Sequence, residues 1–425
     1  MEERRQPSRP KTGEAPFGLD EVFYSKTDDR GVIESGNHVF SRVSGYDWDE
    51  LIGAPHKIVR HPDMPKAVFW LLWERLKEKR PVGAYVKNRA KDGLHYWVFA
   101  AAMPSGSGYL SARIKPSSPL LKTVEDLYAD LRRKEAEDGL SPEDSSTYLL
   151  EQLKSLGFAT YEQFASHALG VELSSRNAGL GLPPDQRIEN FTRLANLSDD
   201  LVLRTSELVA EFDTVKIIPQ NMRIIASRLE PSGGPISTLS QNYGLMSEEI
   251  SQWFERNVIG ANSNFSTIKD SVTTSMFNQC MAGILQACIT CLATDRRDLN
   301  KVDIISAQAD LAQLVEKYTT DSVSKLSQAT READRIVSAC QDMRRHALGL
   351  NTTRIMAKIE GARSLRDGAA LQDVISQLKT FQTRIDSLLS DIADHGEDIR
   401  TIASQRDGIR PVKTQGRTTD LAAAS

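Results

Sequence analysis

The spacing of apolar residues divides the chain into a mixed N-terminal part and a helical remainder. Between Phe23 and Ile114, short β-prone segments alternate with helical ones. The longest helical segment follows Pro65 and repeats apolar residues with the i, i+3, i+4, i+7 spacing of one buried helix face. The residues of that face are Phe69, Leu72, Trp73 and Leu76. The N-terminal pattern therefore predicts an α+β domain.

Five strands are expected in this domain, at residues 22–25, 31–34, 82–90, 94–103 and 109–114. A short helix is expected to begin at Asn37, between the second and third strands. The third and fourth strands should form a hairpin, because Asp92-Gly93 between them is a favoured two-residue turn. These elements predict a five-stranded antiparallel sheet with flanking helices.

Beyond Pro184 the apolar residues recur at alternating steps of four and three, which is typical of helices that pack as coiled coils. A first run stops at the helix-breaking sequence PSGGP, residues 231–235, and a new run follows it. A second pair of runs is interrupted near residues 366–368. Pro219 lies inside the first run and should break or kink that helix. The pattern predicts an all-α region of two antiparallel hairpins, packed as a coiled coil or four-helix bundle.

These patterns predict six segments along the chain. They are disordered tails at 1–17 and 409–425, the sheet domain at 18–118, a helical connector at 119–185, and hairpins at 186–298 and 299–408. The segment Lys115–Leu121 leads out of the sheet domain, so we expect it to pass conformational changes to the connector.

Composition narrows the class of protein. The net charge of -4 and the pI near 6.1 argue against general nucleic-acid binding, which favours a basic face. Four cysteines and the absence of a signal peptide in MEERRQPSRPK indicate a cytoplasmic location. The longest apolar stretch, Met276–Ala293, is interrupted by polar residues. We expect a buried helix there and no membrane span.

Little in the chain suggests catalysis or metal binding. No nucleotide-binding, zinc-protease or serine-hydrolase motif occurs, so we expect no enzyme activity. Cys288 and Cys291 form a CxxC pair, but no second pair or nearby histidine completes a zinc site. We therefore expect these two residues and Cys280 to belong to the core, with a redox pair as the alternative.

Three short sequences in the N-terminal domain are more specific. They are VRHPDMP at Val59–Pro65, VKNR at Val86–Arg89 and HYWV at His95–Val98. The window of residues 37–97 that contains them resembles the PAS sensory domain of bacterial aerotaxis receptors. That resemblance implies bound FAD, through which members of the family report redox state.

The resemblance also implies the residues that hold the cofactor: Arg60, His61, Asp63 and Asn88. Arg and His can face the electron-rich edge or phosphates of a flavin, and Asn can bond ring heteroatoms. The chain departs from the family at Val82, where a Trp is common. Tyr85 and Trp97 are the candidates to stack on the ring in its place. A different ligand, or a PAS domain without any ligand, stays open as an alternative.

Asp63 and His61 also have a purely structural interpretation. Asp63 precedes Pro65 at the expected start of a helix, where aspartate is a common N-cap and proline a common first-turn residue. His61 could be a turn residue that hydrogen-bonds to the backbone. Asp63 could also serve both as this cap and as support for the cofactor site.

The two helical hairpins resemble each other and, faintly, the tip of the methyl-accepting chemotaxis signalling hairpin. NMRIIASRLE, which ends at Glu230, aligns with NTTRIMAKIE, which ends at Glu360, and IEGAR ends at Arg363. The resemblance places these three charged residues at a signalling tip and implies an adaptor or kinase of chemotaxis type as partner. The chain departs from the family in one respect, because the long glycine-rich return segment is missing.

The combined expectation is a cytoplasmic signal-transducing sensor. A PAS domain would sense redox state or oxygen through bound flavin and pass the change to the helical bundle. Two related hairpins in one chain predict an intramolecular bundle, with a homodimer as the alternative. The alternative functions are a cofactor-free PAS adaptor or scaffold for protein partners, and a haem or small-molecule sensor.

Overall fold

The chain folds into two compact units. The computed structural model describes residues 9–215, 217–229, 234–257, 264–294, 304–363 and 368–404. The described part of the first unit lies within residues 1–188 and 276–323, and that of the second within 189–275 and 324–405. Helices α10 (Asn264–Thr294) and α11 (Ile304–Arg363) contribute to both units.

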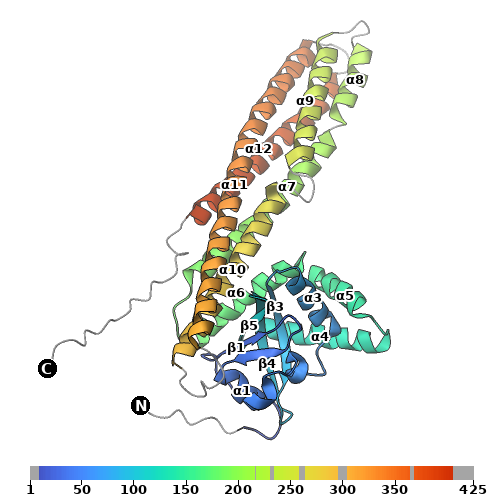
Figure 1. Cartoon of the computed structure of the whole chain (residues 1–425). Coiled ribbons are helices and arrows are strands. Elements are labelled where there is room, and N and C mark those ends of the chain that lie inside the picture. Colours follow the sequence, from blue (N-terminus) through green and yellow to red (C-terminus); the bar gives the residue numbers. More distant parts are fainter. Residues whose placement is uncertain are drawn as a thin grey trace, which may run out of the picture. The chain divides into compact units, whose positions relative to one another are not determined.

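The first unit contains a five-stranded antiparallel sheet (Figure 1). Its strand order is β2-β1-β5-β4-β3. The strands are β1 (Val22–Thr27), β2 (Ile33–Gly36), β3 (Val82–Arg89), β4 (His95–Ser105) and β5 (Gly108–Ile114). The five predicted strands are confirmed, with small shifts at their ends. Because β1 and β5 are neighbours, Ser25 stands opposite Ser111 in the sheet.

Local sequence explains the hairpin and the first helix. Gly93 adopts φ +91°, and its amide donates to the Ala90 carbonyl at 2.9 Å, as a tight turn requires. Helix α1 (His38–Ser44) begins after Asn37, as predicted. The Asn37 side-chain oxygen accepts from the backbone amides of Tyr24 at 3.0 Å and Phe40 at 3.3 Å. One side chain thus caps α1 and attaches it to β1.

Three further helical elements follow α1: α2 (Trp48–Leu51), the 3-10 helix η1 (His56–Val59) and α3 (Lys66–Lys77). The connector forms α4 (Leu120–Glu137), α5 (Pro142–Ser155) and α6 (Tyr161–Gly179). The Tyr128 hydroxyl donates to the Tyr85 carbonyl at 3.1 Å, and the Tyr161 hydroxyl donates to the Gly83 carbonyl at 2.9 Å. Helices α4 and α6 therefore pack directly on β3.

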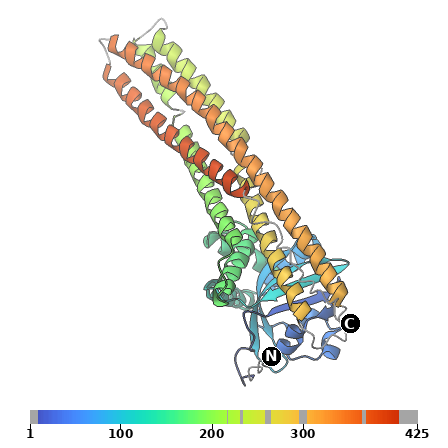
Figure 2. The same cartoon turned by 90° about the vertical axis from the view of Figure 1, so that its left-hand side faces the viewer.

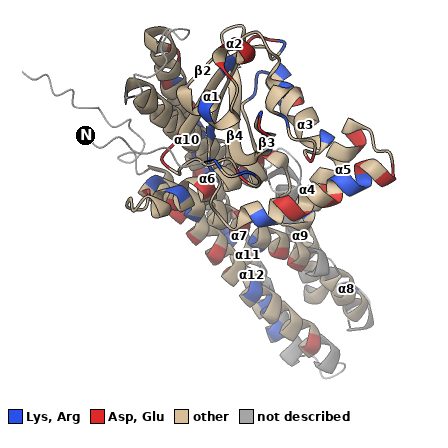
Figure 3. Cartoon of the chain, turned by 90° about the horizontal axis from the view of Figure 1, so that it is seen from below, with Lys and Arg blue, Asp and Glu red and all other residues tan. Residues whose placement is uncertain are grey.

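Helices α4 and α5 carry charged residues of both signs along their length (Figure 3). On α4, Arg133 lies 3.1 Å from Glu137, and Lys122 lies 2.8 Å from Asp126. These are exposed i, i+4 pairs, which contribute little to stability but keep the helix soluble. This part of the connector offers no single-signed surface.

Residues 276–323 pack with the sheet, although they were predicted to belong to the helical hairpins. Lys26 of β1 forms an ion pair of 2.9 Å with Asp310 of α11, and the Cys288 thiol of α10 lies 3.9 Å from the Phe23 carbonyl. Within the described residues, one helix, Asn264–Ala293, is long and apolar enough to cross a membrane. More than half of its most apolar window is buried in the fold, and the core helix of a soluble protein has the same properties.

The described part of the second unit is helical apart from Ile217 and Gly234 (Figure 2). It contains the whole of α8 (Ile218–Leu229), α9 (Pro235–Asn257) and α12 (Gly368–Ser404). It also contains most of α7 (Gln186–Val215) and parts of α10 and α11. Helix α7 ends at Val215 and α8 begins at Ile218, so the predicted helix break near Pro219 is present. Phe212 of α7 packs edge-on against Phe381 of α12 at 5.4 Å. Segments from both predicted hairpins therefore meet within one unit.

Candidate ligand-binding site

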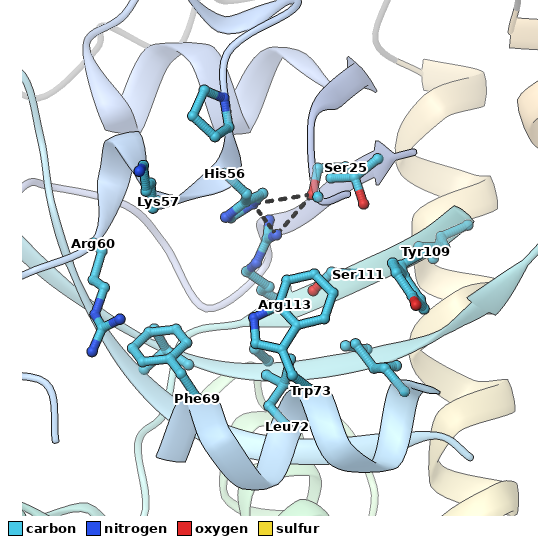
Figure 4. A pocket seen from close by; sticks show the side chains of 18 of the residues that line it. Ser25, His56, Lys57, Arg60, Phe69, Leu72, Trp73, Tyr109, Ser111 and Arg113 are labelled. Carbon is cyan, nitrogen blue, oxygen red and sulfur yellow. Dashed lines mark hydrogen bonds between the residues drawn. The ribbon is translucent and has the colours of Figure 1, made fainter. Parts of the chain in front are cut away.

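A cavity of about 460 Å³ lies between α3, η1 and the sheet (Figure 4). This volume falls within the range of about 300–1,000 Å³ that is typical of small-molecule and cofactor sites. Its walls are mostly apolar, and a few polar side chains project into it. Side chains of a strand alternate between the faces of a sheet, so one face of β1, β3, β4 and β5 forms the floor.

The α3 wall consists of Phe69, Leu72, Trp73 and Leu76, the face that the sequence predicted to be buried. The core positions of α3 are instead Ala67, Val68 and Leu71, with Leu76 shared between the two faces. The ring of Trp73 packs edge-on against Tyr109 at 5.4 Å. The four predicted residues thus share one face of α3, but this face lines the cavity and is not packed into the core.

Helix α3 is not capped by Asp63, which corrects the structural interpretation of that residue. Its N-cap position is Pro65, which makes no side-chain hydrogen bond. The carboxylate of Glu135 in α4 accepts from the amides of Lys66 at 2.6 Å and Ala67 at 3.4 Å. The free amides of the first helical turn are therefore satisfied from the connector.

Two of the four predicted cofactor residues, Arg60 and Asn88, line the cavity. They come from different elements and are joined by a backbone bridge. The Arg60 guanidinium lies 3.9 Å from the centre of the Phe69 ring. Desolvation lowers the pKa of Arg60. Asn88 is buried, and its side chain faces the cavity from β3.

The other two, His61 and Asp63, lie outside the cavity lining. Asp63 is 62% exposed and lies 2.6 Å from the Lys87 ammonium, whose hydrogen bond lowers the pKa of this carboxyl. His61 Nδ1 accepts from the Asp63 amide at 3.1 Å, the turn interaction that the sequence suggested. Desolvation lowers the pKa of His61. These residues hold the turn beside the cavity and do not face a ligand in it.

The stacking candidates Tyr85 and Trp97 face away from the cavity. Both alternate with its lining residues along their strands, so they point to the opposite side of the sheet. The Tyr85 hydroxyl donates to Glu172 of α6 at 2.7 Å, and Trp97 packs near Tyr128 of α4 at 6.1 Å. The role predicted for them does not fit this cavity, whereas Phe69 and Trp73 offer aromatic rings to it.

Sequence reasoning missed a polar cluster of Arg113, His56 and Ser25 at the cavity (Figure 4). One terminal nitrogen of Arg113, Nη2, donates to Ser25 Oγ at 2.7 Å and contacts His56 Nε2 at 2.6 Å. Desolvation and the Arg113 charge lower the pKa of His56 to about 3. Desolvation lowers the pKa of Arg113 to about 10, so it stays cationic at neutral pH.

The predicted signalling tip lies mostly outside the described residues. Glu230 is not among them, and Glu360 and Arg363 are described only as part of the α11 backbone. Cys280 and Cys288 are buried, as expected of core residues, and Cys291 is half-buried. No group of His, Cys, Asp or Glu among the described residues could hold a metal ion.

Comparisons with known proteins agree with this geometry over the N-terminal part. Residues 34–108 match the family model described as PAS fold. The chain is 45% identical to the aerotaxis receptor of Escherichia coli strain K12 over 121 residues, which are 27% of this chain and 24% of that receptor. It therefore matches about a quarter of the length of this relative.

Among solved structures, the Erythrobacter litoralis EL346 blue-light activated histidine kinase is similar at 11% identity and a TM-score of 0.23. The likeness covers 43% of this chain and 58% of that one, and its low score adds nothing to the assignment. The family match and the sheet are sufficient: residues 34–108 form a PAS domain, in a chain that is similar over part of its length to an aerotaxis receptor.

Proposed function

We propose that this protein is a cytosolic redox sensor without enzyme activity. Its PAS domain binds a flavin in the cavity and passes the state of that flavin to the helical unit. The observation that carries the proposal is the cavity itself. Its lining contains two residues that the aerotaxis-receptor resemblance assigns to FAD, Arg60 and Asn88.

The lining chemistry fits a flat aromatic cofactor. Phe69 and Trp73 offer ring faces or edges from α3, and Ala100 and Ala102 leave room above the sheet. The Asn88 amide can bond to ring heteroatoms. Arg60 and Lys57 stand together on one side of the cavity, where they would bind the phosphates of FAD (Figure 4). A bound flavin would supply reversible electron transfer, which the side chains lack.

Signal transfer can begin at β3, since its two faces meet different partners. The side chains of Val86 and Asn88 face the cavity. The side chain of Tyr85, which alternates with them along the strand, faces the connector. A change in hydrogen bonding at Asn88 therefore acts on a strand whose opposite face is hydrogen-bonded to α6.

Glu172 of α6 is the residue that holds both β3 and the exit segment. Its buried carboxylate accepts from the Tyr85 hydroxyl at 2.7 Å and from the amides of Ser117 at 2.6 Å and Ser118 at 3.0 Å. The Ser118 hydroxyl donates to it as well, at 2.6 Å. Movement of β3 would thus change the forces on the segment that leads out of the sheet domain.

The similarity to an aerotaxis receptor supports a proposal for the downstream partner. We propose that the helical unit acts on an adaptor or kinase of chemotaxis type. The match to the aerotaxis receptor covers only part of either chain. A pull-down of purified candidate proteins by this chain, with oxidised and reduced samples compared, tests the partner separately from the cofactor.

An absorbance spectrum of the purified full chain, oxidised and then reduced, tests the cofactor. We expect the flavin bands to be present and to bleach on reduction. A chain that stays colourless after incubation with FAD would overturn the flavin proposal and favour a cofactor-free adaptor. A Soret band would instead favour haem.

A further inference from the structure

Arg113 of β5 has hydrogen-bond donors that the protein leaves unused. Its side chain is buried, and the residue is only 4% exposed. Both neighbours, Ser25 and His56, contact the same nitrogen, Nη2. The other terminal nitrogen, Nη1, has no hydrogen-bond partner among the described residues. A guanidinium can only donate, so these N–H groups require an acceptor from elsewhere.

The charge of Arg113 is also uncompensated. No ion pair joins it to a carboxylate of the described residues. Besides His56, the ionisable groups that act on the pKa of Arg113 are Tyr96 and Cys288. Burial raises the pKa of both, so both are neutral at neutral pH. The Phe40 ring, 5.4 Å away, adds only a weak cation–π contact. A buried cation without a partner is costly, and such costs persist mainly where a function requires them.

Ser25 and His56 orient the guanidinium without neutralising it. Because Arg113 donates, His56 Nε2 must accept, and the ring proton resides on Nδ1. His56 is neutral over the physiological range and adds no second positive charge. Arg113 is thus a fixed cation of the cavity lining, held on Nη2 by two neutral acceptors.

We propose that Arg113 contacts the electron-rich edge of the bound ligand and selects the reduced, negatively charged form of a flavin over the neutral oxidised form. This inference rests on the proposed function. One electron added without a proton gives the ring one negative charge, and its carbonyl oxygens and nitrogens become stronger acceptors. A buried guanidinium stabilises that charge more than it stabilises the neutral ring. Ser25 and His56 are positioning residues.

Replacement of Arg113 by Met in the full chain tests the inference, since Met removes the charge and keeps an unbranched side chain. The measurement is the midpoint potential of bound flavin, titrated with an electrode and a mediator dye that supply the electron. We expect at least a tenfold loss of preference for the reduced form, which lowers a one-electron potential by about 59 mV. Arg113→Lys keeps a charge but loses the planar fork, so an intermediate shift is expected.

Arg42→Met is the matched control, because it also removes one arginine from the PAS domain. Arg42 lies outside the cavity lining and pairs with Glu21 at 2.5 Å. This variant should leave the potential unchanged. A shift as large as that of Arg113→Met would show a general charge effect and overturn the inference.

Stability of the flavin-free chain gives a second readout. Because Nη1 has no partner, Arg113→Met should leave the melting temperature of the flavin-free chain unchanged or raise it, while it reduces the rise caused by added FAD. A structural role predicts a lower melting temperature and an unchanged potential, and that result would overturn the inference. A parent chain that binds no flavin overturns the proposed function. A loaded parent with the same potential as Arg113→Met overturns this inference alone.

Discussion

The carboxylate of Glu135 accepts a hydrogen bond from the backbone amide of Lys66 at 2.6 Å, so a residue of the connector caps the helix that lines the cavity. The Ser145 hydroxyl donates to the same oxygen at 2.7 Å, and Arg132 lies 3.0 Å from the other. The Glu135 side chain is fully buried. The position of α3 therefore depends on α4 and α5 as well as on its own sequence.

Glu135→Ala should destabilise the PAS domain and weaken ligand binding together. Loss of a buried carboxylate leaves the amides of Lys66 and Ala67 without an acceptor, which costs about 1–3 kcal/mol. Denaturant unfolding, with and without FAD, measures both effects. Glu137→Ala is the control. Glu137 is on the same helix but exposed, and solvent screens its pair with Arg133, so the loss of that pair should change stability little. Equal losses in the two variants would contradict the role of Glu135.

The local elements could be predicted from sequence because their causes are local. The alternation of β3 and β4, the Asp92-Gly93 turn and the Asn37 cap each depend on residues close along the chain. The cap of α3 could not be predicted, since its acceptor lies 69 residues further along. Asp63 has the residue type and position of a cap, but the non-local carboxylate fills that role and leaves Asp63 to pair with Lys87.

Asn88→Ala should lower flavin content far more than Asp63→Ala does. Asn88 lines the cavity, whereas Asp63 is mostly exposed and reaches the site only through His61 and Lys87. Flavin content per chain after purification is the measurement. The exposed Asp63–Lys87 pair contributes at most about 1 kcal/mol of stability. Because the pKa of Asp63 is lowered, that contribution is lost as the pH falls through it. Equal flavin loss in both variants would show that the turn is part of the contact surface.

The cluster at Arg113 escaped prediction for a topological reason. Ser25, His56 and Arg113 are separated by tens of residues, and none belongs to a recognisable motif. They meet because β1 and β5 pair and η1 lines the same cavity as these two strands. A strand order cannot be derived from periodicity alone. The available signal was weak: a single arginine in the otherwise weakly polar strand Tyr109–Ile114.

Tyr85→Phe should separate ligand binding from signal transfer. It removes the hydroxyl that donates to Glu172 but leaves the ring against Phe99, 5.0 Å away. The expected stability loss is about 0.5–1.5 kcal/mol. We expect normal flavin content but faster hydrogen exchange at Ser117 and Ser118, whose amides share the Glu172 carboxylate. Unchanged exchange in both oxidation states would argue against a route through this contact.

Acidification should weaken the PAS domain through His56. Its pKa is lowered from 6.5 to about 3 in the folded chain, so the unfolded chain binds the proton more strongly. Stability attributable to this residue is therefore present above pH 6.5 and declines between pH 6.5 and about 3. The comparison is the free energy of unfolding of parent and His56→Gln at several pH values. The free energy of unfolding of the parent minus that of His56→Gln should shrink or change sign as the pH falls. A difference independent of pH would contradict the assignment.

The second unit should form within one chain. Arg384 of α12 lies 3.0 Å from Glu207 of α7, close to the Phe212–Phe381 contact. Spin labels on Glu207→Cys and Arg384→Cys, with the native cysteines replaced by Ser, should therefore be in close range. The exposed ion pair contributes at most about 1 kcal/mol, so the double variant should still fold. If α7 and α12 pair within a chain, a large excess of unlabelled chain leaves the short distance unchanged. If the unit is completed by exchange between two chains, the same dilution removes it, and the intramolecular bundle would have to be replaced by a homodimer.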